Sequence, residues 1–194
     1  MADCGRGLQQ VRDIIAAAHK DCSVLEKLQF YDQWATQYEE LQRCGFTLFH
    51  GLDGSAGMLE VAKKKTLYQE LKHGMLGHEQ LPYDSDKYDA VIIVGALSDG
   101  QVPVSLLPEL LRVSKAGGLV CMTTRSNTSN LKYKADLEEE MSSLQSKGFW
   151  EQVLVEEVEQ WEKATSEKEI AKESDYISGV IYIYRKIPDP STGS

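Results

Sequence analysis

The most constraining feature of the sequence is an unbroken apolar run, Ala90–Val94, inside the segment Tyr88–Val94. A strand with one face in water alternates apolar and polar residues, whereas a strand covered on both faces is apolar throughout. The run therefore predicts a buried strand over residues 88–94, followed by a loop over residues 95–103. Such strands are typical of parallel sheets with helices on both faces.

Further predicted strands and helices alternate on either side of this run. Strands are predicted at 46–52, within 67–76 and at 119–124; helices are predicted at 56–65, at 106–113 with a stop at Gly117–Gly118, and around 137–144 with a stop at Gly148. Two later stretches, 149–161 and 179–185, alternate as strands without room for a crossing helix, so we expect an antiparallel pair at the sheet edge. The pattern predicts an α/β fold with a mainly parallel sheet.

The first 42 residues have helical spacing and end before the predicted strands begin. Tyr31, Trp34 and Tyr38 lie three and four residues apart, so they project from one side of a helix. Taken alone, this spacing also fits a helix that packs its aromatic residues on a core. We expect one domain over residues 1–187, with N-terminal helices over 1–42 and a flexible tail over 188–194.

Charge and cysteine content exclude several functions. A net charge of −9 over 194 residues disfavours nucleic acid as a partner. The four cysteines are scattered singly, so we expect no metal site and no disulfide framework, and Cys121 reads as a buried free thiol. The longest apolar run, Ala90–Leu97, is too short to cross a membrane. We expect a location in the cytoplasm, or also in the nucleus.

Ligands of open parallel sheets bind at the carboxyl ends of the strands, and the first such end carries Asp53. The two oxygens of a carboxylate match the vicinal hydroxyls of a ribose, but Asp53 fits a turn or a helix cap equally well. Gly54 would let a ligand approach the backbone. The glycines at 51, 54 and 57 lack the G-x-G-x-x-G spacing, and Asp53 would repel a pyrophosphate, so no dinucleotide loop is predicted.

Two more strand ends carry candidate residues. Gly77 and His78 could meet an adenine edge, although His78 also fits a solvated loop. Gly95 and Ala96 are small enough to leave room for a ligand. Asp99 could orient a nucleophile as a catalytic carboxylate, or it could be an exposed turn residue before Gly100.

The chain resembles the class I S-adenosylmethionine-dependent methyltransferases. The segments that carry the resemblance are Phe30–Ala35, His50–Glu60, Ala90–Pro103 and Gly117–Lys134. It implies a Rossmann-like fold, S-adenosylmethionine as cofactor, and methyl transfer to a small-molecule or protein acceptor.

The resemblance also implies roles for the candidate residues. Asp53 would hold the ribose hydroxyls, with Gly54 beside the adenosine. Gly77 and His78 would meet the adenine, with Gly77 in the place of the usual acidic residue. Gly95 and Ala96 would flank the methionine portion. Tyr31, Trp34 and Tyr38 would match the aromatics of a lid helix over the cofactor.

One departure from the family pattern is large. Tyr38–Glu40 runs almost directly into Leu41–Gly45, which resembles the end of the family's first helix, so the first strand and its glycine-rich loop are absent. That strand is central in the family's sheet, and its loop cradles the methionine end of the cofactor. We therefore predict that the chain repacks or folds poorly and binds S-adenosylmethionine weakly or not at all. The alternatives are a non-catalytic isoform that binds a partner and a nucleotide-binding oxidoreductase.

Overall fold

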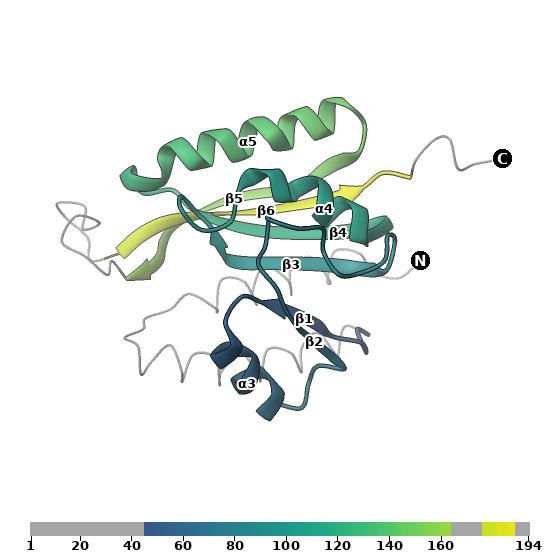
Figure 1. Ribbon diagram of the computed structural model, residues 1–194. Coiled ribbons are helices and arrows are strands. Elements are labelled where there is room, and N and C mark those ends of the chain that lie inside the picture. The colour runs from purple at the N-terminus through teal and green to yellow at the C-terminus, as the bar shows by residue number, and fades with distance from the viewer. Residues whose placement is uncertain (1–44, 164–175, 189–194) are drawn as a thin grey trace. The chain divides into compact units, whose positions relative to one another are not determined.

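The computed structural model describes residues 45–163 and 176–188, in two compact units that divide between Met75 and Leu76 (Figure 1). The predicted N-terminal helices over residues 1–42 lie outside the described residues, as does the tail from residue 189 onward. The single domain over residues 1–187 stays a prediction.

The first unit contains strand β1 (His50–Asp53), helix α3 (Ala56–Lys64) and strand β2 (Glu70–His73). The two strands pair in parallel, which confirms the predicted strand–helix–strand order. Strand β1 is shorter than the predicted 46–52; before it, the Phe49 N–H donates to the side-chain Oε1 of Gln69 at 2.6 Å, and the Gln69 N–H donates to the Phe49 carbonyl at 2.9 Å.

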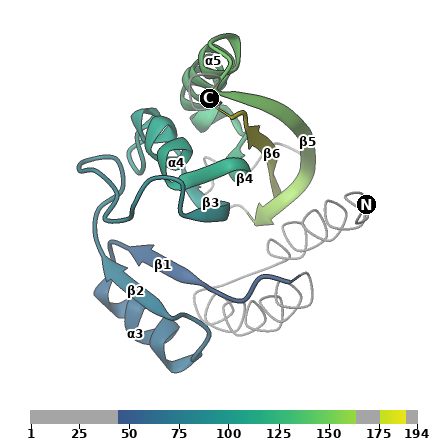
Figure 2. The same ribbon diagram turned by 90° about the vertical axis from the view of Figure 1, so that its right-hand side faces the viewer.

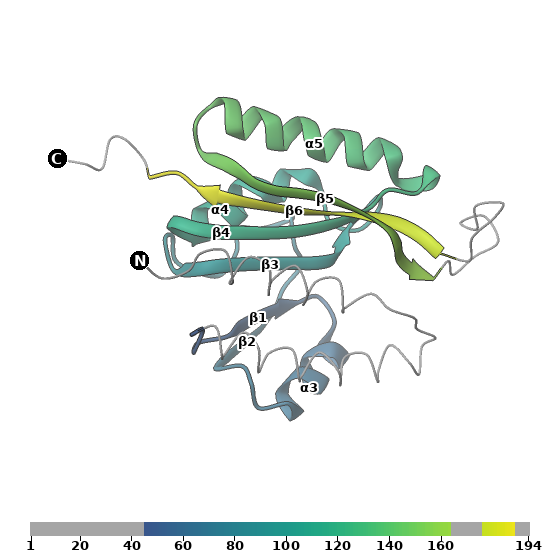
Figure 3. The same cartoon turned by 180° about the vertical axis from the view of Figure 1, so that it is seen from behind.

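The second unit is built on four strands. They are β3 (Tyr88–Leu97), β4 (Ser114–Arg125), β5 (Trp150–Lys163) and β6 (Tyr176–Lys186), in the order β3-β4-β6-β5. Strands β3 and β4 are parallel, while β6 is antiparallel to both β4 and β5, which confirms the predicted C-terminal antiparallel pair. Helices α4 (Leu107–Val113) and α5 (Leu131–Ser146) lie on the same face of this sheet (Figures 2 and 3).

Strand β3 differs from its prediction in length. It continues to Leu97, so the predicted loop start at Gly95 is wrong; Gly95 has φ +71° at a register shift between Ile93 and Leu97. This is a β-bulge, in which glycine adopts the left-handed conformation easily. Helices α4 and α5 cover one face of the sheet (Figure 2), and Ile93 is 7% exposed; coverage of the other face stays a prediction.

The predicted glycine stop of helix α4 is wrong as well. The helix ends at Val113 and is capped by Ser114, the first residue of strand β4, whose hydroxyl donates to the Leu110 carbonyl at 2.7 Å. Gly117 and Gly118 lie inside β4. A Cβ on Gly118 would lie 3.1 Å from the Asp89 carbonyl oxygen, so glycine permits close approach of two backbones.

The core of the second unit lies between its sheet and its helices. Leu137, Met141 and Leu144 are buried, which confirms the predicted stripe of α5, and Gly148 follows the helix with φ +78°. Cys121 is a free thiol that is 1% exposed, as predicted. Among the described residues, no helix combines the length and apolarity that a membrane crossing needs.

Candidate cofactor site

Asp53 ends strand β1 and shapes the turn into helix α3. Its Oδ1 accepts a hydrogen bond from the Ser55 N–H at 2.7 Å, while the Ser55 hydroxyl oxygen accepts from the Met58 N–H at 3.3 Å. Ser55 is therefore the helix cap and Asp53 the turn residue. The second carboxylate oxygen of Asp53 has no hydrogen-bond partner among the described residues, and the side chain is half-buried. It can accept a bond from a ligand hydroxyl.

Gly54 is tied to the end of strand β2. Its carbonyl lies 2.9 Å from the Nε2 of His73, and the Gly74 N–H donates to the Asp53 carbonyl at 3.2 Å. A Cβ on Gly54 would meet the Met75 sulfur at 2.7 Å. Because the Met75 side chain is flexible and 61% exposed, the space beside Gly54 can open for a ligand.

Gly77 is a glycine for a structural reason. It has φ +81°, and a Cβ there would lie 2.3 Å from the Cγ of Pro103. The acidic residue that the family resemblance places here could not be accommodated without shifting Pro103. His78 is exposed and lines, with Gly77, a cavity of about 320 Å³ that also borders Ser105 and Glu109.

A charged network holds the loop that follows Gly77. The Arg112 guanidinium donates to both carboxylate oxygens of Glu109 at 2.9 Å and to the Leu81 and Tyr83 carbonyls at 2.9 Å. Hydrogen bonding from Arg112 lowers the pKa of Glu109, which stays charged at neutral pH. The Glu109 carboxylate in this wall is therefore balanced by Arg112 and fixed in place.

Gly95 and Ala96 lie in the bulge of strand β3. The Gly95 N–H donates to the Thr123 hydroxyl of strand β4 at 3.1 Å. Apart from Gly95 and its two chain neighbours, no atom of the described residues lies within 4 Å of the position that a Gly95 Cβ would take, so this side of the bulge is open. The geometry fits the predicted space for a ligand at the end of the strand.

Asn130 is a residue that the sequence interpretation missed. It is 4% exposed; its Nδ2 donates to the Thr124 hydroxyl at 3.0 Å and to the Arg125 carbonyl at 2.8 Å, and its Oδ1 accepts from the Asp99 N–H at 3.0 Å. Thr124 in turn donates to the Leu97 carbonyl at 2.6 Å. These hydrogen bonds connect the carboxyl ends of β3 and β4. Asp99 itself is exposed, so its carboxylate can reach solvent or substrate.

The predicted residues are distributed over the two units. Gly77, His78, Gly95, Ala96 and Asp99 belong to the second unit, whereas Asp53 and Gly54 belong to the first. The aromatic residues Tyr31, Trp34 and Tyr38 lie outside the described residues. Over residues 45–163 and 176–188, no group of three or more His, Cys, Asp or Glu side chains could hold a metal ion.

Comparison with known sequences defines the family. A methyltransferase-domain family model matches residues 34–122. Methyltransferase-like protein 27 of Homo sapiens is 40% identical to the chain, over 76% of this chain and 77% of that protein. The chain belongs to the class I S-adenosylmethionine-dependent methyltransferases. Membership implies S-adenosylmethionine as the methyl donor.

The same alignment bears on the missing strand. It runs over 190 positions but takes in only 76% of the 194 residues of this chain. Several tens of positions of the relative therefore have no counterpart here. Several tens of residues are enough to form a strand, a loop and a helix.

Two solved structures share the fold. A SAM-dependent methyltransferase from Methanosarcina mazei has a TM-score of 0.51 and 14% identity, covering 72% of this chain and 82% of its own. The [4+2]-cyclase SpnF has a TM-score of 0.56 and 14% identity, covering 94% of both chains. These likenesses show the Rossmann-like α/β fold; because one neighbour is a cyclase, the fold by itself does not define the reaction.

Proposed function

We propose that this chain keeps part of the S-adenosylmethionine site but binds the cofactor weakly, so that methyl transfer to its acceptor is slow or lost. The observation that carries this proposal is the division of the described strands into two sheets, β1-β2 and β3-β4-β6-β5. In the family resemblance, the absent first strand lies in the centre of a single sheet, between the strands that β1 and β3 represent. Without it, the sheet has no central strand and no glycine-rich loop.

The retained residues fit parts of the cofactor. The free oxygen of Asp53 suits a ribose hydroxyl, and the open side of Gly95 suits the methionine portion. Gly77 offers no carboxylate to the adenine, and its contact with Pro103 opposes one. The residues present therefore fit the ribose better than the rest of the molecule.

Bound S-adenosylmethionine would supply a methyl group on a sulfonium, which an acceptor attacks in line. The chain's own contribution to such a transfer is alignment and the exclusion of water. Asp99 is the candidate base, and Asn130 fixes its backbone at the strand end. The acceptor would be a small molecule or a protein, because the net charge of −9 opposes nucleic acid.

Energetics favour weakened binding over a fully compensated site. One unpaired buried polar group costs about 1–3 kcal/mol. A whole domain is stable by only about 5–15 kcal/mol. The loss of a buried central strand removes many such pairings together. The small free energy of unfolding that remains leaves little to hold the cofactor-binding residues in position.

Retention on immobilised adenosylhomocysteine tests the proposal. The matched control is a chain with the missing segment, taken from Methyltransferase-like protein 27, inserted after Glu40. We expect the restored chain to be retained and this chain to pass through; the restored chain with Asp53→Ala should pass through as well. Equal retention of this chain and the restored chain would contradict the proposal. Retention of both on a nicotinamide resin instead would favour an oxidoreductase.

A second candidate is a non-catalytic isoform that binds a partner protein. Exposed apolar side chains favour it: Leu48 is 71% exposed and Ile92, in the middle of strand β3, is 42% exposed. Exposed apolar residues of this kind can mark interaction surfaces. Cofactor-independent binding of a partner by this chain, unchanged by Asp53→Ala, would support this candidate.

A further inference from the structure

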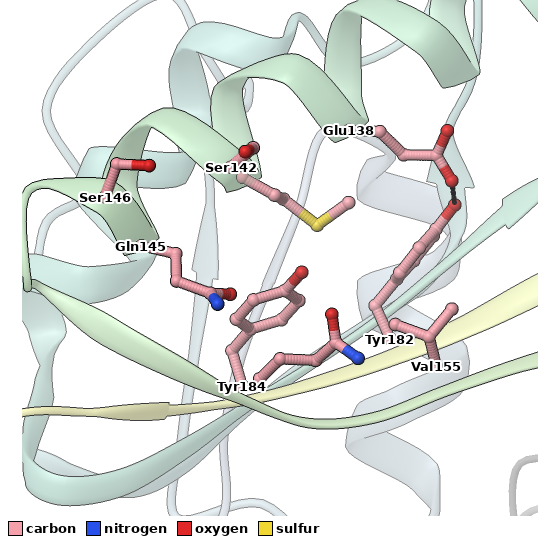
Figure 4. Close-up of a pocket in the computed structure, with 9 residues that line it drawn as sticks. Glu138, Ser142, Gln145, Ser146, Val155, Tyr182 and Tyr184 are labelled. Carbon is pink, nitrogen blue, oxygen red and sulfur yellow. Dashed lines mark hydrogen bonds between the residues drawn. The ribbon is translucent and has the colours of Figure 1, made fainter.

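A cavity of about 410 Å³ lies between helix α5 and strands β5 and β6 (Figure 4). Its volume falls in the range of about 300–1,000 Å³ that small-molecule pockets occupy. Within the second unit, it lies away from the carboxyl ends of β3 and β4, which Asn130 joins. Tyr184, in the cavity, pairs with Val120 near the start of β4, whereas Thr124 at the carboxyl end pairs with Val180.

The side chain that defines this cavity is Tyr184. It is 5% exposed, and its ring lies against Trp150 with centroids 4.4 Å apart. Its hydroxyl points into the cavity and has no hydrogen-bond partner among the described residues (Figure 4). Among the described residues the one buried side-chain oxygen or nitrogen without a partner is Asn127 Oδ1, so the Tyr184 hydroxyl is accessible to solvent and can donate to a ligand in place of water.

The groups around Tyr184 determine the charge of a fitting ligand. Tyr182 donates to the Glu138 Oε1 at 2.7 Å, and the Lys134 ammonium lies 2.8 Å from the same oxygen. The carboxylate is therefore already balanced by a cation. Burial, with the charge of Glu138, raises the pKa of Tyr184, so its hydroxyl remains a donor at neutral pH.

The remaining polar groups of the lining are neutral. Ser142, Gln145 and Gln152 contribute hydroxyl and carboxamide groups that can donate and accept hydrogen bonds. Met141 and Val155 add apolar surface beside them. Strand β5 and helix α5, which border the cavity, are joined by a hydrogen bond from the Trp150 Nε1–H to the Met141 carbonyl at 3.0 Å.

We propose that this cavity binds a neutral polyhydroxyl molecule of sugar or cyclitol type, with Tyr184 donating to one of its hydroxyls. Hydroxyl groups of the ligand can both donate hydrogen bonds to, and accept them from, the serine, glutamine and tyrosine groups of the lining. An anion finds no free cation in the described lining, and an ammonium would compete with Lys134 for Glu138. The site does not depend on methyl transfer.

Methyl-labelled methionine NMR on the full chain tests this proposal, with the Met141 methyl as reporter and the Met58 methyl of the first unit as reference. The probes are D-glucose and myo-inositol, with inorganic phosphate as the anionic comparison. We expect a saturable shift of the Met141 signal with at least one neutral probe and none with phosphate. Absence of a saturable shift with both neutral probes, or a stronger response to phosphate, would overturn the proposal.

Variants separate binding from folding. Tyr184→Phe keeps the ring on Trp150 and removes the donor, so we expect affinity to fall about 3- to 10-fold, as for one lost hydrogen bond. Ser142→Ala should weaken binding, whereas Ser143→Ala, on the same helix but outside the lining, should leave it unchanged. Unfolding midpoints show whether each variant is folded. Unchanged affinity in a folded Tyr184→Phe variant would also overturn the proposal.

Discussion

The side chain of Asn130 holds the backbone of Asp99: its Oδ1 accepts the Asp99 N–H at 3.0 Å. Through Thr124 and Arg125, the same side chain reaches the end of strand β4. One buried amide therefore joins the loop after β3 to the loop after β4. The position of the candidate catalytic carboxylate depends on that amide.

Replacement of Asn130 by alanine should destabilise the protein by about 2–3 kcal/mol, because three hydrogen bonds are lost at a buried site. Urea denaturation followed by circular dichroism measures this change. Asn127→Ala is the matched control: among the described residues its Oδ1 has no partner and its Nδ2 donates only to Ser129, so we expect a cost below about 1 kcal/mol. Equal costs for the two variants would contradict the role given to Asn130.

Restoring the family's acidic residue through Gly77→Asp should destabilise the chain instead of improving cofactor binding. A left-handed backbone and the contact with Pro103 together cost about 2–4 kcal/mol. Gly100→Ala, at φ +72° with no atom near its Cβ position, should cost only about 1–2 kcal/mol. Thermal unfolding of both variants checks the difference, and a more stable Gly77→Asp chain would refute it.

Stability should fall as the solution becomes alkaline. Burial raises the pKa of the Cys121 thiol from an ordinary 9.0 to about 12. Above pH 9 the unfolded chain loses this proton while the folded chain keeps it, so the free energy of unfolding declines until the folded thiol titrates. The slope from this one group is about 1.4 kcal/mol per pH unit.

Cys121→Ala isolates that contribution. The variant should be less stable at neutral pH because it leaves a small void, yet its stability should fall less steeply above pH 9. Urea midpoints at neutral pH and at about pH 11 give the two slopes. Burial also raises the pKa of Tyr133 to about 12. This group lowers the free energy of unfolding at alkaline pH equally in the unmodified protein and in the Cys121→Ala variant. Identical slopes would rule out a buried, protonated Cys121.

Periodicity predicted most of the elements, because the spacing of apolar residues along the sequence reflects which face of a helix or strand is buried. The stripe of α5 and the paired strands β5 and β6 were predicted closely for this reason. The bulge at Gly95 and the glycines inside β4 were not, because each depends on a neighbouring strand. Gly118 permits the approach of strand β3, a contact between residues far apart in the sequence.

Candidate site residues could be named from the sequence where a strand end carries its own signal, as at Asp53 and Gly95, and their roles stay predictions. Asn130 was missed because its function lies in hydrogen bonds to Asp99 and Thr124, which local sequence does not encode. Gly77 illustrates the opposite case. The resemblance interpreted it as a lost carboxylate, and the structure adds the contact with Pro103 that requires glycine there.

Calorimetric titration of the chain with S-adenosylmethionine, beside the chain with the strand and loop restored, tests the central claim most directly. We predict micromolar binding by the restored chain and no measurable heat from this chain. Micromolar binding by this chain would contradict the claim, since it would mean that a divided sheet without the glycine-rich loop still forms a complete cofactor site.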